Sequence, residues 1–391
     1  YEDIIDSLTG GRLVGSVTSF ENFAECPLRY YLRYGVDLKE REEFTFSPVN
    51  FGVVLHAVIR EVCDEIKKNG ESYYLISEEK RREMVKRSVA AITDIYQNSI
   101  LKDSSRNSFM IKRMEDLADR TIWAMGEQLK CGDFVPFVFE HKFNMEVGDG
   151  DRKQLMSGTI DRVDICENGT DVYVRIIDYK TGKKDFNIVK TYYGIDIQLM
   201  VYMEAAMKLV AKMRPGKNVI PAGVFYYNIS DPIVSATTES AEEIEDKIKG
   251  ELRLKGMVNS DKDIAEKMDN TEGTSLNIPV SRKADGGFDS RRSKVMNTEQ
   301  FNMLGRFVDV RAVDTADRIA GGDIRRSPYK DGQFSSCDRC PYGAVCGFSV
   351  DLPGCNYRKL KKFDDEVLWN NIKEGVDENG KKMDTGAEEC D

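Results

Sequence analysis

The chain has 391 residues, of which 41% are hydrophobic and 32% charged. This composition is ordinary for a globular protein, and the length allows a large buried core. No uninterrupted apolar run reaches the roughly 20 residues of a membrane-spanning helix, so we expect no membrane partner. The net charge of −10 excludes nucleic-acid binding through overall basic charge. A local basic group is present near the last cysteines, formed by Arg325, Arg326, Lys330, Arg358, Lys359, Lys361 and Lys362.

The nine cysteines are too sparse for a disulfide scaffold. Their odd number and a tight C-x2-C-x5-C group favour a reducing, cytoplasmic location and a metal site. The chain begins at Tyr1 without a Met or the features of a signal peptide. We therefore expect it to be a piece of a longer protein.

Helical spacing of apolar residues predicts helices over 16–35, 51–68, 77–101 and 108–130. The first of these should start at Ser16 and end at Gly35. Strands are predicted next, over 136–147, 154–165 and 172–180, with a turn at Asn168-Gly169. There follow a helix over 195–212, a strand over 221–228, helices over 241–256 and 298–320, and an irregular polar stretch over 257–297.

This order indicates an α/β fold, in which a mixed sheet is flanked by helices. We expect one domain over residues 1–362, with its core at about 136–228. A helical insertion over about 77–130 and an irregular insertion over about 230–297 would extend it. Residues 363–391 are predicted to be a flexible tail.

Two acids and a lysine end one apolar face of the predicted hairpin. With the turn centred on Asn168-Gly169, Asp161 faces Ile176, and Asp178 becomes its diagonal neighbour at roughly 7–8 Å. Lys180 shares that side, because alternate residues of a strand point the same way. Charges beside an apolar stripe need compensation. A divalent cation would supply it, although a surface salt bridge to Lys180 explains the residues equally well.

Four cysteines could hold a second inorganic group. Cys26 stands alone, whereas Cys337, Cys340 and Cys346 form the C-x2-C-x5-C group. Four thiolates suit either zinc or an iron–sulfur cluster, and an uneven one-plus-three division is commoner for clusters. The remaining cysteines are expected to be packed or incidental thiols.

Several motifs together resemble the PD-(D/E)xK nucleases, a restriction-endonuclease-like fold, and its RecB-like branch in particular. They are Gly158-Thr159-Ile160-Asp161, Asp178-Tyr179-Lys180, Gln198 with Tyr202 and Phe51-Gly52-x2-Leu55-His56. The resemblance implies a metal-dependent DNA exonuclease. It assigns Mg²⁺ or Mn²⁺ to Asp161, Asp178, the carbonyl of Tyr179 and His56. Lys180 would position the attacking water, while Gln198 and Tyr202 would orient the lysine and the DNA backbone.

Glu140 occupies a strand position where related nucleases often carry an acid. It could be a ligand or support one, and an ordinary surface glutamate fits the sequence equally well. The cysteines, with Cys26-Pro27 and Cys340-Pro341, resemble the [4Fe–4S] staple of the same branch.

The resemblance extends from Gly10-Gly11-Arg12-Leu13 to Asn356-Tyr357-Arg358 and is similar to the AddB family of helicase–nuclease subunits. It implies degradation of single DNA strands, the 5′-terminated one, during recombinational repair of double-strand breaks, beside an AddA-type subunit. The chain has no Gly-x4-Gly-Lys-Ser/Thr loop, since Gly10-x4-Gly15-Ser16 lacks the lysine. Two alternatives stay open: a CRISPR-associated nuclease of the same branch, and a module that binds DNA ends without cutting them.

Overall fold

The computed structural model describes residues 14–39, 48–95, 105–147, 154–235 and 240–377. Gly10–Leu13 and residues 378–391 lie outside the described residues, as do 96–101 of the predicted third helix. The helices are α2 (Val17–Glu25), α3 (Pro27–Tyr30), a π-helical turn η1 (Tyr31–Gly35), α4 (Pro48–Lys68), α5 (Glu78–Ile95), α6 (Ser105–Lys130), α7 (Ile188–Tyr192), α8 (Gln198–Met213), α9 (Ala241–Glu251), α10 (Lys262–Met268), α11 (Thr298–Ala320), α12 (Gly343–Cys346) and α13 (Asp365–Asp377). No helix among these described residues is long and apolar enough to cross a membrane.

A mixed sheet forms the centre of the molecule, as predicted. Its strands are β1 (Val14–Ser16), β2 (Val135–Val147), β3 (Gln154–Asn168), β4 (Asp171–Lys180), β5 (Asn218–Asn228), β6 (Lys255–Asn259) and β7 (Val295–Met296). They are ordered β1-β3-β4-β5-β6-β7, with β2 also paired to β3. β3 and β4 are antiparallel, whereas β4 and β5 are parallel. Three short strands, β8 (Tyr329–Asp331), β9 (Phe334–Ser335) and β10 (Arg358–Lys359), form a separate small sheet.

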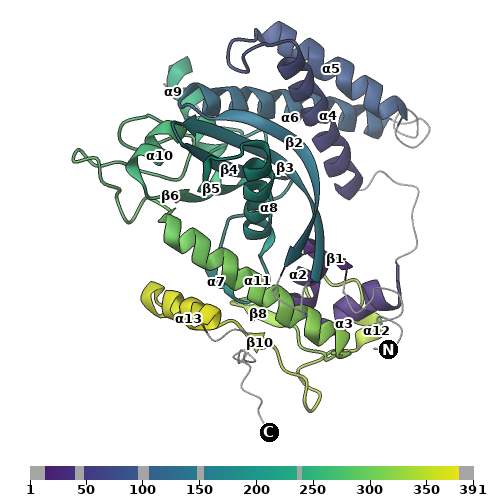
Figure 1. Ribbon diagram of the computed structural model, residues 1–391. Helices are drawn as coiled ribbons and strands as arrows, with labels where there is room; N and C mark the ends of the chain where they lie inside the picture. The colour runs from purple at the N-terminus through teal and green to yellow at the C-terminus, as the bar shows by residue number, and fades with distance from the viewer. Residues whose placement is uncertain (1–13, 40–47, 96–104, 148–153, 236–239, 378–391) are drawn as a thin grey trace.

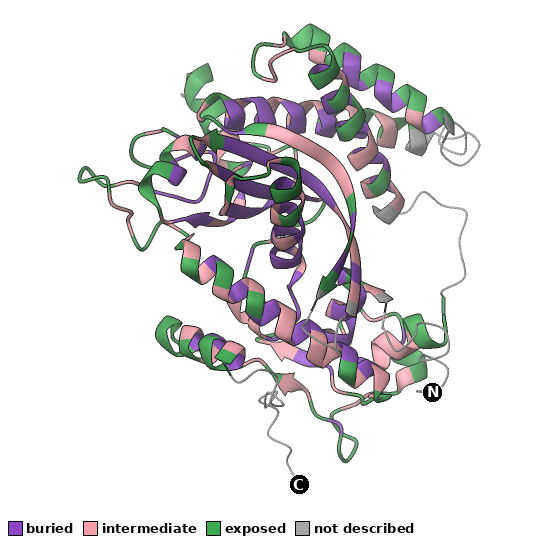
Figure 2. Ribbon diagram, in the orientation of Figure 1, coloured by how far each residue is buried: buried purple, intermediate pink, exposed green. Residues whose placement is uncertain are grey.

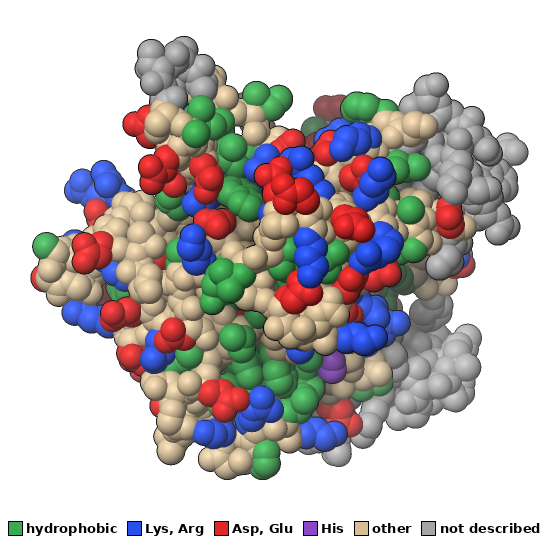
Figure 3. Space-filling model, turned by 90° about the horizontal axis from the view of Figure 1, so that it is seen from above, with side chains coloured by type: hydrophobic (Ala, Val, Ile, Leu, Met, Phe, Trp, Pro, Cys, Tyr) green, Lys and Arg blue, Asp and Glu red, His purple; other side chains and the backbone are tan. Residues whose placement is uncertain are grey.

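Helices cover both faces of the sheet, and the strands between them are buried (Figures 1 and 2). One apolar core joins α4, α5 and α6 to the face of β4 that carries Tyr173 and Ile177. The other joins α8 and α11 to the opposite face, formed by Val163, Ile165, Val172, Val174 and Ile176. Alternate residues of the hairpin therefore face opposite sides of the sheet, as the sequence predicted. Seen from above, acidic and basic side chains are interspersed over the surface of the molecule (Figure 3).

The predicted helix over 16–35 is interrupted at Cys26. Ser16 caps α2 as expected, because its side chain accepts the backbone N–H of Ser19. Cys26 is extended, with φ −166° and ψ 118°, and α3 starts at Pro27. The cause is local, since a residue that precedes proline is disfavoured in the helical region.

Two further expectations were wrong. The stretch 257–297 contains α10 and two strands, β6 and β7, that extend the main sheet. The predicted helix over 241–256 correspondingly ends at Glu251. The expected flexible tail contains α13, whose Leu368 and Ile372 are buried in the core under α11. Residues four apart lie on one face of a helix, so this spacing provides a packing face.

A buried ion triad stabilises the hairpin. The carboxylate of Asp164 lies 2.6 Å from a guanidinium nitrogen of Arg162 and 2.8 Å from one of Arg175. All three side chains are essentially unexposed. Paired charges of this kind tolerate burial only as a complete set, since the loss of one member leaves the others uncompensated.

We expect Asp164→Ala to lower the free energy of unfolding by about 3–5 kcal/mol, because two buried guanidinium groups would lose their counter-charge. Urea denaturation followed by circular dichroism measures this change. Glu167→Ala is the matched control, since Glu167 forms an exposed ion pair with Arg214, and its effect should stay within about 1 kcal/mol. Equal effects of the two substitutions would contradict the assignment.

Candidate metal-dependent nuclease site

The site lies where the pairing of β3 with β4 ends. The ladder runs from Asn168 opposite Asp171 to Arg162 opposite Ile177. Its turn residues are Gly169 and Thr170, and Gly169 has a φ of +60°. The turn is thus centred one residue later than predicted, and Asp161 does not face Ile176. Continuing the observed register by one residue places Asp161 opposite Asp178. The observed pairing differs from the predicted one by two residues, and side chains alternate between the two faces, so both acids remain on the predicted face.

Asp161 fixes the geometry of this strand end. Its Oδ2 accepts the backbone N–H of Tyr179 at 2.6 Å, so a side chain takes the place of a ladder partner. The carboxylate is buried, and its other oxygen is directed towards helix α4. The two strands are therefore held together by Asp161 itself at the point where the acids meet.

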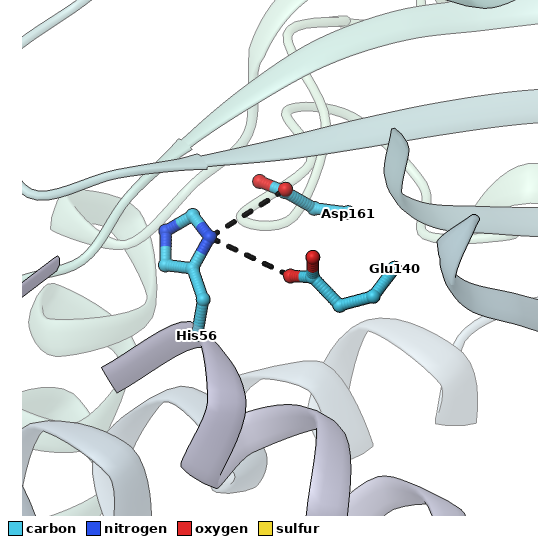
Figure 4. Close-up of side chains that lie close together, drawn as sticks. All are labelled: His56, Glu140 and Asp161. Atoms are coloured by element: carbon cyan, nitrogen blue, oxygen red, sulfur yellow. Dashed lines mark ion pairs between the residues drawn. The ribbon is translucent and has the colours of Figure 1, made fainter. Parts of the chain in front are cut away.

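Three ligand-type side chains converge on this point from different elements (Figure 4). Nδ1 of His56, on α4, lies 3.5 Å from Oδ1 of Asp161 and 3.6 Å from Oε1 of Glu140 on β2. One ligand atom from each residue lies within 4.8 Å of the others. His56 and Asp161 were predicted to be neighbours. Glu140, which the sequence left undecided, completes the group.

Glu140 adopts an unusual backbone conformation. Its φ is +47°, although it belongs to strand β2. Non-glycine residues with such angles are uncommon, and they concentrate at functional sites where the surrounding structure holds them in place. Local sequence patterns do not report such an angle, which explains why the sequence could not decide the role of Glu140.

Asp178 lies beside this group and is paired with Lys180. Its buried Oδ2 lies 2.5 Å from Nζ of Lys180. Lys180 donates to Oε1 of Gln198 at 3.0 Å, and Nε2 of Gln198 donates to the hydroxyl of Tyr202 at 2.9 Å. Hydrogen bonds therefore connect Lys180, Gln198 and Tyr202 in one chain.

Gly158 permits this packing. A Cβ atom at this position would stand 2.8 Å from the ring of Phe143 and 3.0 Å from that of Tyr202. The two rings meet edge to face with their centroids 5.6 Å apart. The first residue of the Gly158-Thr159-Ile160-Asp161 motif is thus small because the rings of Phe143 and Tyr202 both lie against it.

The electrostatics of the site suit a divalent cation. Burial raises the pKa of Asp178 to about 7, with a further contribution from Asp161. Burial lowers the pKa of His56, but its interactions with Asp161 and Glu140 prevail and raise it to about 10. Three carboxylates, those of Asp161, Glu140 and Asp178, thus share two cationic side chains, His56 and Lys180. Oxygen-rich sites of this kind fit Mg²⁺ or Mn²⁺.

A second polar cluster adjoins Gln198, and the sequence did not reveal it. Oε1 of Glu21, on α2, accepts the backbone N–H groups of Ile197 and Gln198. Asp196 accepts a hydrogen bond from Tyr226 at 2.6 Å and pairs with Lys184 at 3.0 Å. Glu21 lies in a stretch that contributes to the family resemblance, but nothing in the local pattern gave it a role.

The four predicted staple cysteines are brought together from both ends of the chain. Cys26, Cys337, Cys340 and Cys346 line one small pocket at the junction of α3 with α12, and all are free thiols. The purple and yellow segments of Figure 1 meet there. Cys355 is also buried, but it is not part of this pocket. The four cysteines thus line one pocket although more than 300 residues of sequence separate Cys26 from the other three.

Burial raises the pKa values of the Cys26 and Cys337 thiols, and neighbouring cysteines raise them further. The backbone N–H groups of Leu28, Arg29 and Ser327 act in the opposite direction on Cys26. Among the described residues, no three of these sulfur atoms lie mutually within 4.8 Å.

Comparison with known proteins agrees with this geometry. A family model described as the PD-(D/E)XK nuclease superfamily matches residues 15–347. The chain belongs to this superfamily.

Three bacterial relatives, each named as the B-type subunit of an ATP-dependent helicase/deoxyribonuclease, are similar to nearly the whole chain. The protein of Lachnoclostridium phytofermentans is 34% identical over 99% of this chain and 34% of its own length. That of Thermoanaerobacter sp. is 33% identical over 94% of this chain and 33% of its own length. That of Clostridium acetobutylicum is 34% identical over 95% of this chain and 33% of its own length. The chain thus spans about a third of these relatives.

The crowding of carboxylates predicts a gain in stability when one is removed from metal-free protein. The raised pKa of Asp178 means that its ionised form opposes folding, fully above pH 7 and not at all below about pH 4. We expect Asp178→Asn to raise the free energy of unfolding by roughly 1–3 kcal/mol at pH 8 in the presence of EDTA. Urea denaturation at pH 8 and pH 4 measures it, and an equal gain at both pH values would contradict this origin.

Proposed function

We propose that the chain is the metal-dependent nuclease domain of a helicase–nuclease of the AddB type, degrading single DNA strands as an exonuclease. The nuclease domain, expected over residues 1–362, would extend through α13 (Asp365–Asp377), because Leu368 and Ile372 are buried in its core. One observation carries the proposal: His56, Glu140 and Asp161 converge on a single point beside Asp178 and Lys180. Such a combination matches the metal ligands and the lysine that phosphodiester hydrolysis needs.

We assign the metal ligands to side chains from four elements, α4, β2, β3 and β4. His56 would contribute a nitrogen, and Asp161 and Asp178 would contribute carboxylate oxygens from neighbouring strands. The carbonyl of Tyr179 stays in the set. Glu140 joins it as a ligand, because its carboxylate lies in the same group of atoms. A divalent cation held by these groups would polarise the scissile phosphate and offset the charge that develops on it.

Lys180 is proposed to act on the phosphate and the attacking water. Its ammonium group is held between Asp178 and Gln198, so its position is determined from two sides. A cation fixed in this way can stabilise negative charge on the reacting phosphate without moving during the reaction. Gln198 and Tyr202 would keep the lysine in place and contact the DNA backbone.

The substrate and partner are inferred from the relatives. Their names couple a deoxyribonuclease with an ATP-dependent helicase and mark each protein as one subunit of the whole. We therefore propose that DNA strands separated by a helicase reach this site, and that an AddA-type subunit is the partner. The role would lie in processing double-strand breaks for recombination.

Asp178→Ala should reduce Mg²⁺-dependent degradation of labelled single-stranded DNA by roughly 100-fold or more, since it removes a ligand and the partner of Lys180. Denaturing gels with and without Mg²⁺ provide the measurement. Asp185→Ala is the control, because Asp185 forms an exposed pair with Lys294. Binding of DNA ends without any turnover by the wild-type chain would instead favour a non-catalytic module.

We further propose that Cys26, Cys337, Cys340 and Cys346 hold a [4Fe–4S] cluster. The four thiols line one pocket, and backbone N–H groups are directed at Cys26. Hydrogen bonds of this kind to cysteine sulfur accompany such clusters and favour the thiolate form. The cluster would join the start of the domain to its end.

Protein purified without oxygen should be brown and contain about four iron and four sulfide per chain. Cys340→Ala should lose this content, because three thiolates would remain, whereas Cys355→Ala should retain it. Elemental analysis and absorption spectra of the three proteins decide the matter. Zinc without iron in the wild-type protein would overturn the assignment.

A further inference from the structure

Helix α8 carries Gln198 and Tyr202 but does not provide its own N-terminal cap. Its N-cap residue, Ile197, makes no side-chain capping hydrogen bond. The first N–H groups of a helix have no partner within the helix and need an acceptor from elsewhere when they are buried. Ile197 is itself buried, so the start of α8 depends on another part of the chain.

Glu21 of α2 supplies that acceptor. Its Oε1 lies 3.0 Å from the backbone nitrogen of Ile197 and 3.0 Å from that of Gln198. The contact spans 176 residues of sequence, and it joins the second element of the chain to the helix behind the active site. One carboxylate oxygen thus determines where the backbone of Gln198 lies.

The position of Gln198 bears directly on Lys180. The side chain of Gln198 accepts from Lys180 and donates to Tyr202, and Lys180 is paired with Asp178. Displacement of the α8 N-terminus would therefore move the amide that holds the lysine. We infer that Glu21 is a positioning residue, whose carboxylate holds the start of α8 so that Gln198 keeps Lys180 beside Asp178. This inference rests on the proposed nuclease function.

The surroundings keep Glu21 in this place. Lys184, Asp196 and Lys180 provide the charges that act on its carboxylate. Lys184 pairs with Asp196 and lies over the ring of Tyr226, with Nζ 4.5 Å from the ring centroid. Burial raises the pKa of Glu21 to about 7. Near neutral pH the carboxyl group of Glu21 is therefore protonated in a large fraction of the molecules. The acceptor oxygen matters more than the charge.

Glu21 also lies close to the cysteine pocket in the chain. Helix α2 ends at Glu25, and Cys26 follows it. Glu25 provides a matched control on the same helix, because its carboxylate pairs with Arg29 of α3 and not with α8.

The test compares Glu21→Ala, Glu21→Gln and Glu25→Ala in the full chain. Hydrolysis of single-stranded DNA in Mg²⁺ gives kcat and KM, with thermal melting as a check on folding. A second measurement needs no activity: reductive methylation with formaldehyde, read by peptide mass spectrometry, reports the accessibility of Lys180, with exposed Lys208 as reference.

We expect Glu21→Ala to lower kcat by roughly 10- to 100-fold, with KM within about twofold, because a small misplacement of a reacting group suffices for such a loss. Methylation of Lys180 relative to Lys208 should rise severalfold. Glu21→Gln should recover most of kcat, since its amide oxygen can accept the same two N–H groups. Glu25→Ala should match the wild type in both measurements.

The inference would be overturned if Glu21→Ala left kcat of the folded protein and the methylation of Lys180 unchanged. It would also be overturned if Glu21→Gln were as impaired as Glu21→Ala, since charge rather than position would then matter. Absence of hydrolysis by the wild type would refute the proposed function. In that case the methylation ratio would still decide whether Glu21 positions Lys180.

Discussion

The hydrogen bond from the backbone of Tyr179 to the carboxylate of Asp161 is the contact on which the site depends. It occurs where β3 and β4 stop pairing, and it lets a side chain hold two strands that the backbone no longer joins. The other oxygen of Asp161 consequently faces His56 and Glu140. Because only one oxygen of Asp161 is used to hold the strands, the other remains available to bind a metal ion.

The two faces of this hairpin differ in how their buried carboxylates are paired with cationic side chains. On one face Asp164 is fully matched by Arg162 and Arg175, and the result is a closed structural triad. At the strand end, carboxylates outnumber the nearby cations, and burial together with the neighbouring Asp161 raises the pKa of Asp178. Incomplete compensation of this kind is unfavourable for stability and typical of sites that bind a cation.

Contacts between distant parts of the chain complete the site. Helix α2 reaches α8 through Glu21, and the same helix leads to Cys26 and the pocket formed with Cys337. The proposed cluster would link Cys26 to Cys337 and close a loop of more than 300 residues, for which the chain-entropy contribution to stability is on the order of 5 kcal/mol. Stability at the ends of the domain and order in the active site are thus connected through one short helix.

Local sequence patterns were sufficient to predict the hairpin, the face shared by Asp161, Asp178 and Lys180, and the helix carrying Gln198 and Tyr202. Alternation, helical spacing and turn residues are local signals, whereas the grouping of four cysteines came from their spacing and from the family resemblance. The register of the hairpin, the inclusion of Glu140, the cap provided by Glu21 and the packing of α13 became apparent only in the folded chain. The left-handed backbone of Glu140 and the reach of Glu21 to α8 arise from contacts between distant segments, which no local pattern encodes.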